Sequence, residues 1–224
     1  NRIVEDYETI PTRKNHYEYQ YVIKKGENYG RYYYISRCKK EVLMDCEKLA
    51  KGHEYWDMAG PLISRSEDTI VYGIDFVGDD ENKIFFRKFD ETKETEIKNP
   101  KGLRISSDFF LAGDSLTFYY VTMDSTGRYS KVWCTRLDDL KHHKCIYTEK
   151  DSLFNVGIST TYDGNHVLLY TTSSDVSEIL LVESKENITT LQHCISSPMI
   201  GELAHNPHAT PDETADQLNI KSLI

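Results

Sequence analysis

Two serines of this chain follow a glycine at the spacing that nucleophilic serine enzymes use. They lie in Gly113–Ser115 (GDS) and in Gly157–Ser159 (GIS). The nucleophile elbow has the pattern G-x-S-x-G, in which the second glycine permits a strained turn between a strand and a helix. Thr117 and Thr161 stand where that glycine is required, and neither triplet is predicted to begin a helix. A side chain at this position would clash in the tight turn, so we predict no catalytic residue.

Histidines and carboxylates give equally little indication of a bound metal. His142 and His143 are adjacent, so they would point to opposite faces of a strand, whereas metal ligands on one strand need i, i+2 spacing. We interpret this pair as part of a solvated loop. His205 and His208 lie beside a helix-breaking proline, and the acidic segment Asp79–Lys83 is interpreted as a solvated hairpin turn rather than a calcium loop. We expect no metal-binding and no cofactor-binding residue.

The chain contains five cysteines, an odd number, and none of them forms a C-x-x-C pair. An odd and scattered set fits the reduced thiols of a cytosolic protein better than a disulfide framework, so the expected location is the cytoplasm. None is accompanied by the histidine and asparagine that a thiol nucleophile uses. We interpret three of them as small core residues of strands: Cys134, Cys145 and Cys194.

The charge and hydropathy of the chain exclude two classes of partner. Its 224 residues include 27 Lys and Arg against 36 Asp and Glu, which gives a formal net charge of −9. Nucleic acids and anionic membranes require a basic surface, and the sequence contains no basic cluster. No apolar run approaches the ~20 residues of a membrane-spanning helix. We therefore expect neither nucleic acid nor a membrane as a partner.

Alternation with a period of two residues dominates the sequence and predicts an all-β chain. In His16–Ile23, tyrosines occupy one face and polar residues the other, as in a half-buried strand. Helical periodicity is confined to Cys46–Lys51 and, more weakly, to Asp212–Leu223. Further segments of strand character follow at short intervals: Arg31–Ser36, Glu41–Asp45, Thr69–Val77, Lys83–Phe89, Ser115–Thr122, Lys131–Leu137, His166–Thr172 and Glu178–Glu183.

These strands recur in a repeat whose units begin with similar turns. Asp68, Asp114 and Asp163 each precede the most hydrophobic strand of a unit, at spacings of 46 and 49 residues. The carboxylate of each is expected to accept backbone N–H groups two residues further on. A small-residue strand comes before each turn, in Asp57–Ser64, Ser106–Ala112 and Asn155–Thr160, and two further strands follow.

Four strands in about 50 residues indicate a β-propeller blade. Between Arg13 and Ser196 there is room for about four blades, a partial propeller of four-stranded antiparallel sheets. A β-sandwich of eight or more strands is the alternative; it explains the strands but leaves the fixed period unexplained.

A family resemblance adds to this interpretation and covers the chain in order from about Arg2 to Ile195. The sequence resembles the N-terminal β-propeller of oligopeptidase B, within the prolyl oligopeptidase family of serine peptidases. No single motif decides it; the resemblance depends on the order of several segments: residues 3–13 (IVEDYETIPTR), 25–29 (KGENY), 34–37 (YISR), 41–45 (EVLMD), 49–53 (LAKGH), 72–75 (YGID), 147–151 (YTEKD) and 154–157 (FNVG).

The resemblance implies a cytosolic, cofactor-free hydrolase of short peptides that cleaves after Arg or Lys. In this family a seven-bladed propeller gates an α/β-hydrolase domain that carries the catalytic Ser, Asp and His. The present sequence departs from that pattern, because it has about four blades and contains neither the preceding helical segment nor the hydrolase domain. It also begins with Asn1 rather than Met, so we expect a processed chain or a fragment.

Two functions remain open at this point. The first is the non-catalytic, substrate-gating part of an oligopeptidase B-like peptidase, inactive alone, with short basic peptides as partners of the parent enzyme. The second is a stand-alone shortened propeller that binds a protein partner. Four blades of a seven-bladed ring would leave two faces uncovered, so we expect contact with the missing catalytic domain or self-association. Asp57 and Asp108, on the first strands of two blades, are candidates for attracting cationic peptides.

The expected propeller ends at residue 196, and the remaining residues 197–224 differ in character. This tail is polar and contains Pro198, Pro207 and Pro211, so it is expected to be linker-like or disordered.

Overall fold

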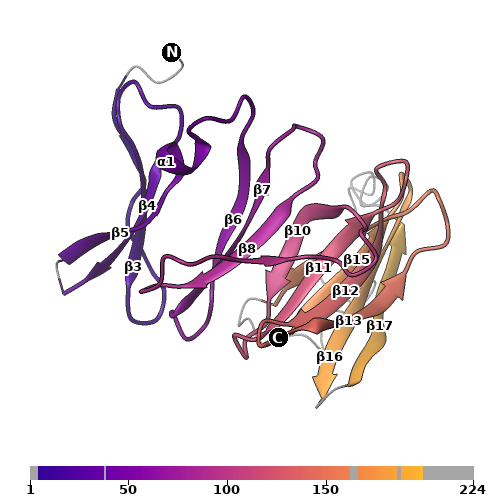
Figure 1. Cartoon of the computed structure of the whole chain (residues 1–224). Coiled ribbons are helices and arrows are strands. Elements are labelled where there is room, and N and C mark those ends of the chain that lie inside the picture. Colours follow the sequence, from indigo (N-terminus) through magenta and orange to yellow (C-terminus); the bar gives the residue numbers. More distant parts are fainter. Residues whose placement is uncertain (1–4, 38, 162–165, 186–187, 199–224) are drawn as a thin grey trace, which may run out of the picture. The chain divides into compact units, whose positions relative to one another are not determined.

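The computed structural model describes residues 5–37, 39–161, 166–185 and 188–198 (Figure 1). Its strands form four antiparallel sheets. The chain divides into two compact units, Asn1–Ile97 and Lys98–Ile224, which we call unit 1 and unit 2 and describe separately. Each unit contains two of the sheets.

Unit 1 consists of a five-stranded sheet, a short helix and a four-stranded sheet. In the first sheet two short strands, β1 and β2, both pair with β3, and β4 and β5 follow in order. The second sheet has the order β6-β7-β8-β9. The elements are β1 (Tyr7–Glu8), β2 (Thr12–Arg13), β3 (Glu18–Ile23), β4 (Arg31–Ser36), β5 (Lys39–Asp45), α1 (Cys46–Ala50), β6 (Asp57–Ile63), β7 (Thr69–Asp75), β8 (Lys83–Lys88) and β9 (Thr95–Ile97).

Unit 2 repeats the four-stranded arrangement twice. Its sheets have the orders β10-β11-β12-β13 and β14-β15-β16-β17, so each strand pairs with the next one along the chain. The elements are β10 (Ile105–Leu111), β11 (Thr117–Met123), β12 (Tyr129–Arg136), β13 (Asp139–Thr148), β14 (Asn155–Thr160), β15 (Val167–Thr172), β16 (Val176–Lys185) and β17 (Ile188–Pro198).

The arrangement confirms the predicted repeat of antiparallel four-stranded units. The separation into four sheets rules out the sandwich alternative, in which two large sheets would face each other. The short helix expected at Cys46–Lys51 is present as α1, whereas the segment Asp212–Leu223 lies outside the described residues. The final strand β17 extends to Pro198, two residues past the expected end of the strand pattern.

Each unit has a core between its two sheets. In unit 1, Leu43 and Met44 of the first sheet pack with Trp56 and with Ile70 and Tyr72 of the second. In unit 2 the corresponding cluster contains Tyr119, Val121, Val132, Val156, Ile158, Val167, Leu169 and Val182. Complete burial of such a side chain stabilises a fold by about 1.5–3 kcal/mol, so these clusters hold neighbouring sheets together.

The aspartate turns that indicated the repeat follow the expected chemistry in one case of two. The Asp114 carboxylate accepts the backbone N–H groups of Leu116 at 2.9 Å and Thr117 at 2.8 Å, as predicted. Asp68 differs, because its carboxylate accepts hydroxyl groups of the turn and the ammonium group of Lys88 at 2.7 Å. Serine hydroxyls adjacent to Asp68 compete successfully with the backbone for its oxygens. Asp163 lies outside the described residues.

Candidate functional site

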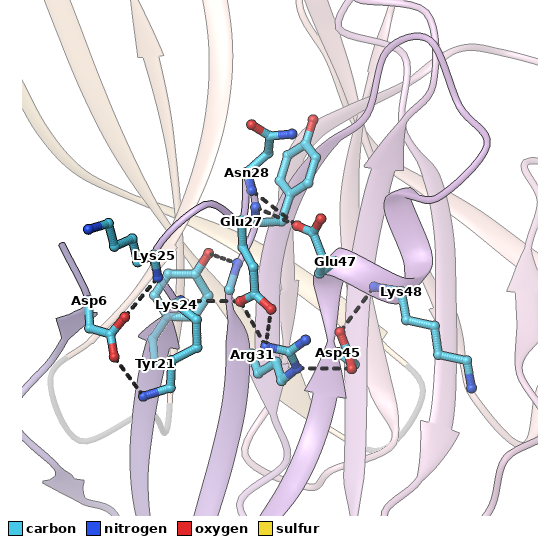
Figure 2. A network of polar contacts seen from close by, with 12 residues as sticks. Asp6, Tyr21, Lys24, Lys25, Glu27, Asn28, Arg31, Asp45, Glu47 and Lys48 are labelled. Carbon is cyan, nitrogen blue, oxygen red and sulfur yellow. Dashed lines mark hydrogen bonds and ion pairs between the residues drawn. The ribbon is translucent and has the colours of Figure 1, made fainter. Parts of the chain in front are cut away.

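One network of polar contacts in unit 1 is centred on Arg31, the first residue of β4. Its Nη1 donates to both carboxylate oxygens of Glu27 at 2.8 Å, and its Nε donates to Asp45 Oδ2 at 3.0 Å (Figure 2). Antiparallel pairing of β4 with β5 places Arg31 opposite Asp45. Hydrogen bonds from both carboxylates raise the pKa of Arg31, so the guanidinium is a permanent cross-link between the β3–β4 turn and the end of β5.

Asp45 and a further carboxylate, Glu47, fix the start of α1 and the turn beside it. Asp45 is the N-cap of α1, and its Oδ1 accepts the Lys48 N–H at 3.0 Å. Glu47 Oε2 accepts the backbone N–H groups of Asn28 at 3.2 Å and Tyr29 at 2.9 Å (Figure 2). The β3–β4 turn is therefore tied to α1 by charged acceptors at two points, which leaves its conformation well determined.

A surface hollow lies over this framework and has mixed charge. Three cationic and three anionic side chains contribute to it, so it suits a polar ligand that carries both signs of charge, such as a peptide. The described residues that line it include no serine, threonine or cysteine, so the hollow offers binding groups rather than a nucleophile. They are Asn28, Tyr29, Arg31, Asp45, Glu47, Lys48, Ala50, Lys51, His53 and Glu54.

The sequence did not single out this hollow. Its charged residues come from the ends of two strands, from α1 and from the loop after it, and the contacts join residues as far apart as Asn28 and Glu47. The only signal was the charged turn Lys24–Asn28, which was interpreted as a connection between strands.

The two aspartates proposed to attract cationic peptides have different surroundings. Asp57, the first residue of β6, is exposed. Asp108 on β10 is half-buried, and its Oδ2 accepts the Ile158 N–H at 2.9 Å, which links the two sheets of unit 2. Burial raises the pKa of Asp108 to about 6, against the opposing effect of that hydrogen bond. Asp57 is consequently the better candidate for attracting cations in solution.

The two glycine–serine triplets lie in β-structure. Gly113–Ser115 occupies the hairpin turn between β10 and β11, and Ser115 has a positive φ of 61°. Gly157–Ser159 lies within β14, where a Cβ on Gly157 would approach the Tyr170 ring to 2.2 Å. As predicted, neither triplet begins a helix, so neither has the geometry of a nucleophile elbow.

The prediction of a solvated loop at the paired histidines is wrong, because both lie on β13. They do point to opposite faces: His142 is exposed and 2.6 Å from Asp139, whereas His143 is half-buried. His143 Nε2 lies 3.0 Å from the Leu140 carbonyl oxygen and must donate to it, so Nδ1 accepts the Tyr120 hydroxyl at 2.6 Å. Burial lowers the pKa of His143 and favours this neutral form.

Metal ligation and membrane insertion find no support in the part of the chain that the structure describes. No group of three His, Cys, Asp or Glu side chains is arranged there to hold a metal ion. Asp79–Lys83 spans the turn between β7 and β8 and ends at the first residue of β8, and His205 and His208 are outside the described residues. Over the same residues, no helix has the length and apolar character needed to cross a bilayer.

The cysteines correct one prediction and add a core residue. Cys145 is exposed on the outer strand β13 rather than buried, and Cys134 is half-buried. Cys46, which the sequence did not single out, is buried in the core of unit 1, and this burial raises its pKa to about 12. A thiol with such a pKa is not a nucleophile at neutral pH. The side chain of Cys194 is not among those described.

Successive antiparallel sheets of four or five strands, in which most strands pair with the next one along the chain, define a β-propeller domain. The family model described as "Prolyl oligopeptidase, N-terminal beta-propeller domain" matches residues 1–197, and the chain belongs to this family. The prediction of a partial propeller with about four blades is thereby confirmed.

Known relatives are considerably longer than this chain. Protease 2 from Moraxella lacunata is 21% identical over 202 residues, which cover 86% of this chain and 29% of the relative. Oligopeptidase B from Trypanosoma brucei, in a closed form with covalently bound antipain, has a TM-score of 0.74 at 23% identity and matches over 88% of this chain and 28% of its own. Oligopeptidase B from Leishmania major has a TM-score of 0.74 at 22% identity, over 88% of this chain and 29% of its own. The chain thus spans under a third of the length of each.

Proposed function

We propose that this chain is the substrate-gating propeller part of an oligopeptidase B-like serine peptidase, and that it has no hydrolytic activity by itself. The observation that carries the proposal is the family match over residues 1–197, which corresponds to the propeller and to less than a third of the oligopeptidase B chains. The placement of Ser115 in a hairpin turn and Ser159 in a strand supports the non-catalytic role.

In this role the propeller admits short peptides to a catalytic domain and excludes folded proteins. The parent enzyme would cleave after Arg or Lys, and the net charge of −9 would raise the local concentration of such cationic peptides. Exposed Asp57 is the side chain we assign to this attraction. Within the chain, residues 1–196 would form the propeller and residues 197–224 a separate tail.

The partner of the chain would be a catalytic domain, and the compartment would be the cytoplasm. Free thiols at Cys46, Cys134 and Cys145 support a reducing environment. Four blades of a ring expected to contain seven would lack two neighbours, so we expect the isolated chain to self-associate. Light scattering tests this, and a monodisperse monomer without hydrophobic dye binding would contradict it.

The catalytic part of the proposal is tested with a serine-directed fluorophosphonate and with peptide substrates ending in Arg or Lys. We expect neither labelling nor turnover, with T. brucei oligopeptidase B as the active control. Stoichiometric labelling would overturn the proposal, and Ser115→Ala and Ser159→Ala variants would then locate the nucleophile.

The gating part requires a chimera. Residues 1–197 would replace the matching segment of the T. brucei enzyme, with a second variant in which that segment is deleted as control. We expect the chimera to cleave a short Arg peptide while sparing a long unfolded protein, which the deletion variant cleaves. Equal cleavage of the long protein by both variants would contradict gating.

A further inference from the structure

The turn between β7 and β8 presents an aliphatic side chain to solvent on a well-fixed backbone. Val77 is 76% exposed. The Asp75 carboxylate accepts the backbone N–H groups of Val77 at 2.8 Å, Gly78 at 2.7 Å and Asp80 at 3.0 Å. Burial of Asp75 opposes its ionisation, but these hydrogen bonds outweigh it and lower the pKa, so the anion persists. The backbone therefore holds Val77 in solvent at no additional ordering cost to a ligand.

Aromatic side chains from the loop before β6 extend this apolar surface. The Tyr55 ring lies over Gly78, where an added Cβ would be 3.2 Å from it, and Tyr55 is still 43% exposed. The His53 ring lies 4.5 Å from the half-buried Phe76 ring, centroid to centroid. We call His53, Tyr55, Phe76 and Val77 the Val77 patch. Rigid aromatic and aliphatic groups of this kind are typical anchors of a binding surface.

The surroundings of the Val77 patch are acidic. The loop before β6 contributes Glu54, the start of β6 contributes Asp57, and the β7–β8 turn contributes Asp79, Asp80 and Glu81. Burial and the nearby carboxylates of Asp57, Asp75 and Asp80 raise the pKa of Tyr55, as expected for a phenol beside acids. One cation, Lys83, lies beside the patch, with its Nζ 5.6 Å from the Phe76 ring centroid. An apolar centre with an acidic rim complements a ligand that combines apolar and basic side chains.

The Val77 patch is continuous with the hollow described above. His53 belongs to the patch and lines the hollow, and Glu54 of the acidic rim lines it as well. An extended chain could therefore contact the patch and the mixed-charge hollow at once, its backbone and charged ends facing polar groups such as the Asn28 amide.

We propose that the Val77 patch and the adjoining hollow bind an extended peptide segment in which a lysine or arginine neighbours an apolar side chain. The apolar side chain contacts Val77 and Tyr55, and the cation faces Asp57 and Asp80. The inference rests on the proposed function, since it names the surface on which this propeller receives basic peptides. Charge complementarity selects this occupant over an acidic or an uncharged one.

The test measures the affinity of a fluorescent hexapeptide, Ser-Arg-Leu-Arg-Leu-Gly, by anisotropy, with a control peptide in which Glu replaces both arginines. Val77→Ser removes the apolar anchor and should weaken binding about fivefold, as expected for loss of one partly desolvated aliphatic contact. Asp80→Asn should weaken it about threefold at low salt, and the difference should vanish at high salt. Asp80 has a φ of 64°, which Asn tolerates equally well, so only the charge changes.

The matched control is Leu153→Ser, because Leu153 is 73% exposed and precedes a strand of unit 2. It should leave the affinity unchanged, and circular dichroism checks that all variants fold. Equal affinity of the wild type and Val77→Ser, or no binding of the basic peptide at all, would overturn the inference. If the variants keep the affinity of the wild type and the chain still prefers the basic peptide, the binding site lies elsewhere. This result would overturn the assignment of the surface and leave the proposed function standing. Equal affinities for the basic and the acidic peptide at low salt would refute the attraction of cations, both in this inference and in the proposed function.

Discussion

The buried side chain of Glu67 links the two sheets of unit 1. It lies in the turn between β6 and β7, and its side chain is 0% exposed. From the first sheet it accepts the N–H groups of Asn15 at 3.2 Å and His16 at 2.5 Å, the Tyr19 hydroxyl at 3.0 Å and His16 Nδ1 at 2.9 Å. Replacing it with glutamine preserves its size while removing the charge and one acceptor oxygen.

The magnitude follows from the position of the two backbone donors. Asn15 donates to Oε1 and His16 to Oε2, so a glutamine amide group must face one of them. A donor that loses its acceptor costs about 1–3 kcal/mol, and the remaining bonds lose their charge assistance. Relief from burying a charge offsets part of this loss. We expect Glu67→Gln to destabilise unit 1 by about 2–3 kcal/mol.

Urea denaturation with one tryptophan as reporter measures this change. The chain has two tryptophans, and Trp56 belongs to unit 1 whereas Trp133 belongs to unit 2. In a Trp133→Phe background, fluorescence reports on Trp56 alone. With a slope of about 2 kcal/mol per M, the midpoint should fall by about 1–1.5 M. The control is Glu91→Gln, an exposed glutamate in the same unit, which should not shift the midpoint.

The pH dependence provides the refuting result. Burial opposes ionisation of Glu67, but hydrogen bonds from His16, Tyr19 and Asn15 outweigh it and lower its pKa below the ordinary 4.5. A lowered folded-state pKa means stabilisation that is present above pH 4.5 and lost as the pH falls further. The wild type and Glu67→Gln should therefore converge in acid. A difference below about 0.5 kcal/mol at pH 7, or one that persists unchanged in acid, would refute the reasoning.

Three further predictions concern unit 2. Because the pKa of Asp108 is raised to about 6, ionisation of this group destabilises the folded state as the pH rises from about 4 through 6. Asp108→Asn should remove this pH dependence and raise the midpoint of thermal denaturation at pH 7. Tyr120→Phe removes the hydroxyl that donates to His143 and should cost about 1–2 kcal/mol at pH 8, measured by denaturation. Because burial lowers the pKa of His143, the loss of stability as the pH falls below 6.5 should persist in this variant at pH 5. Gly157→Ala should cost about 2–4 kcal/mol in thermal denaturation, because the added Cβ meets an aromatic ring. The control is Gly127→Ala, where no atom lies within 4 Å of the added Cβ and φ is 86°; it should cost about 1 kcal/mol.

The order of the strands was predictable because strand and turn signals are local. Hydrophobic segments such as Thr69–Val77 end at turns rich in Asp, Gly and Ser, and their repetition at nearly constant spacing indicates blades. The two-residue strands β1 and β2 were missed, since two residues cannot display an alternation. They exist only because the edge of β3 supplies their hydrogen-bond partners.

The polar site could not be predicted in the same way. Arg31 and Asp45 were each within or beside predicted strands, but their pairing depends on the register of β4 with β5. A shift of one residue would place them on opposite faces. The Val77 patch likewise joins a loop before β6 to a turn after β7, and only the folded sheet brings them together.

By itself the sequence determined that the chain is all-β, that its strands repeat in blades, and that its surface is acidic, because all three follow from residue type and spacing. The tertiary structure decided how residues of the same type differ in role. Cys46 is buried and Cys145 is exposed, and Asp57 faces solvent whereas Asp108 is hydrogen-bonded to a neighbouring sheet. The physical reason is that burial and hydrogen-bond partners are supplied by segments distant in sequence. Local pattern fixes what a residue can do, and packing against those segments fixes what it does.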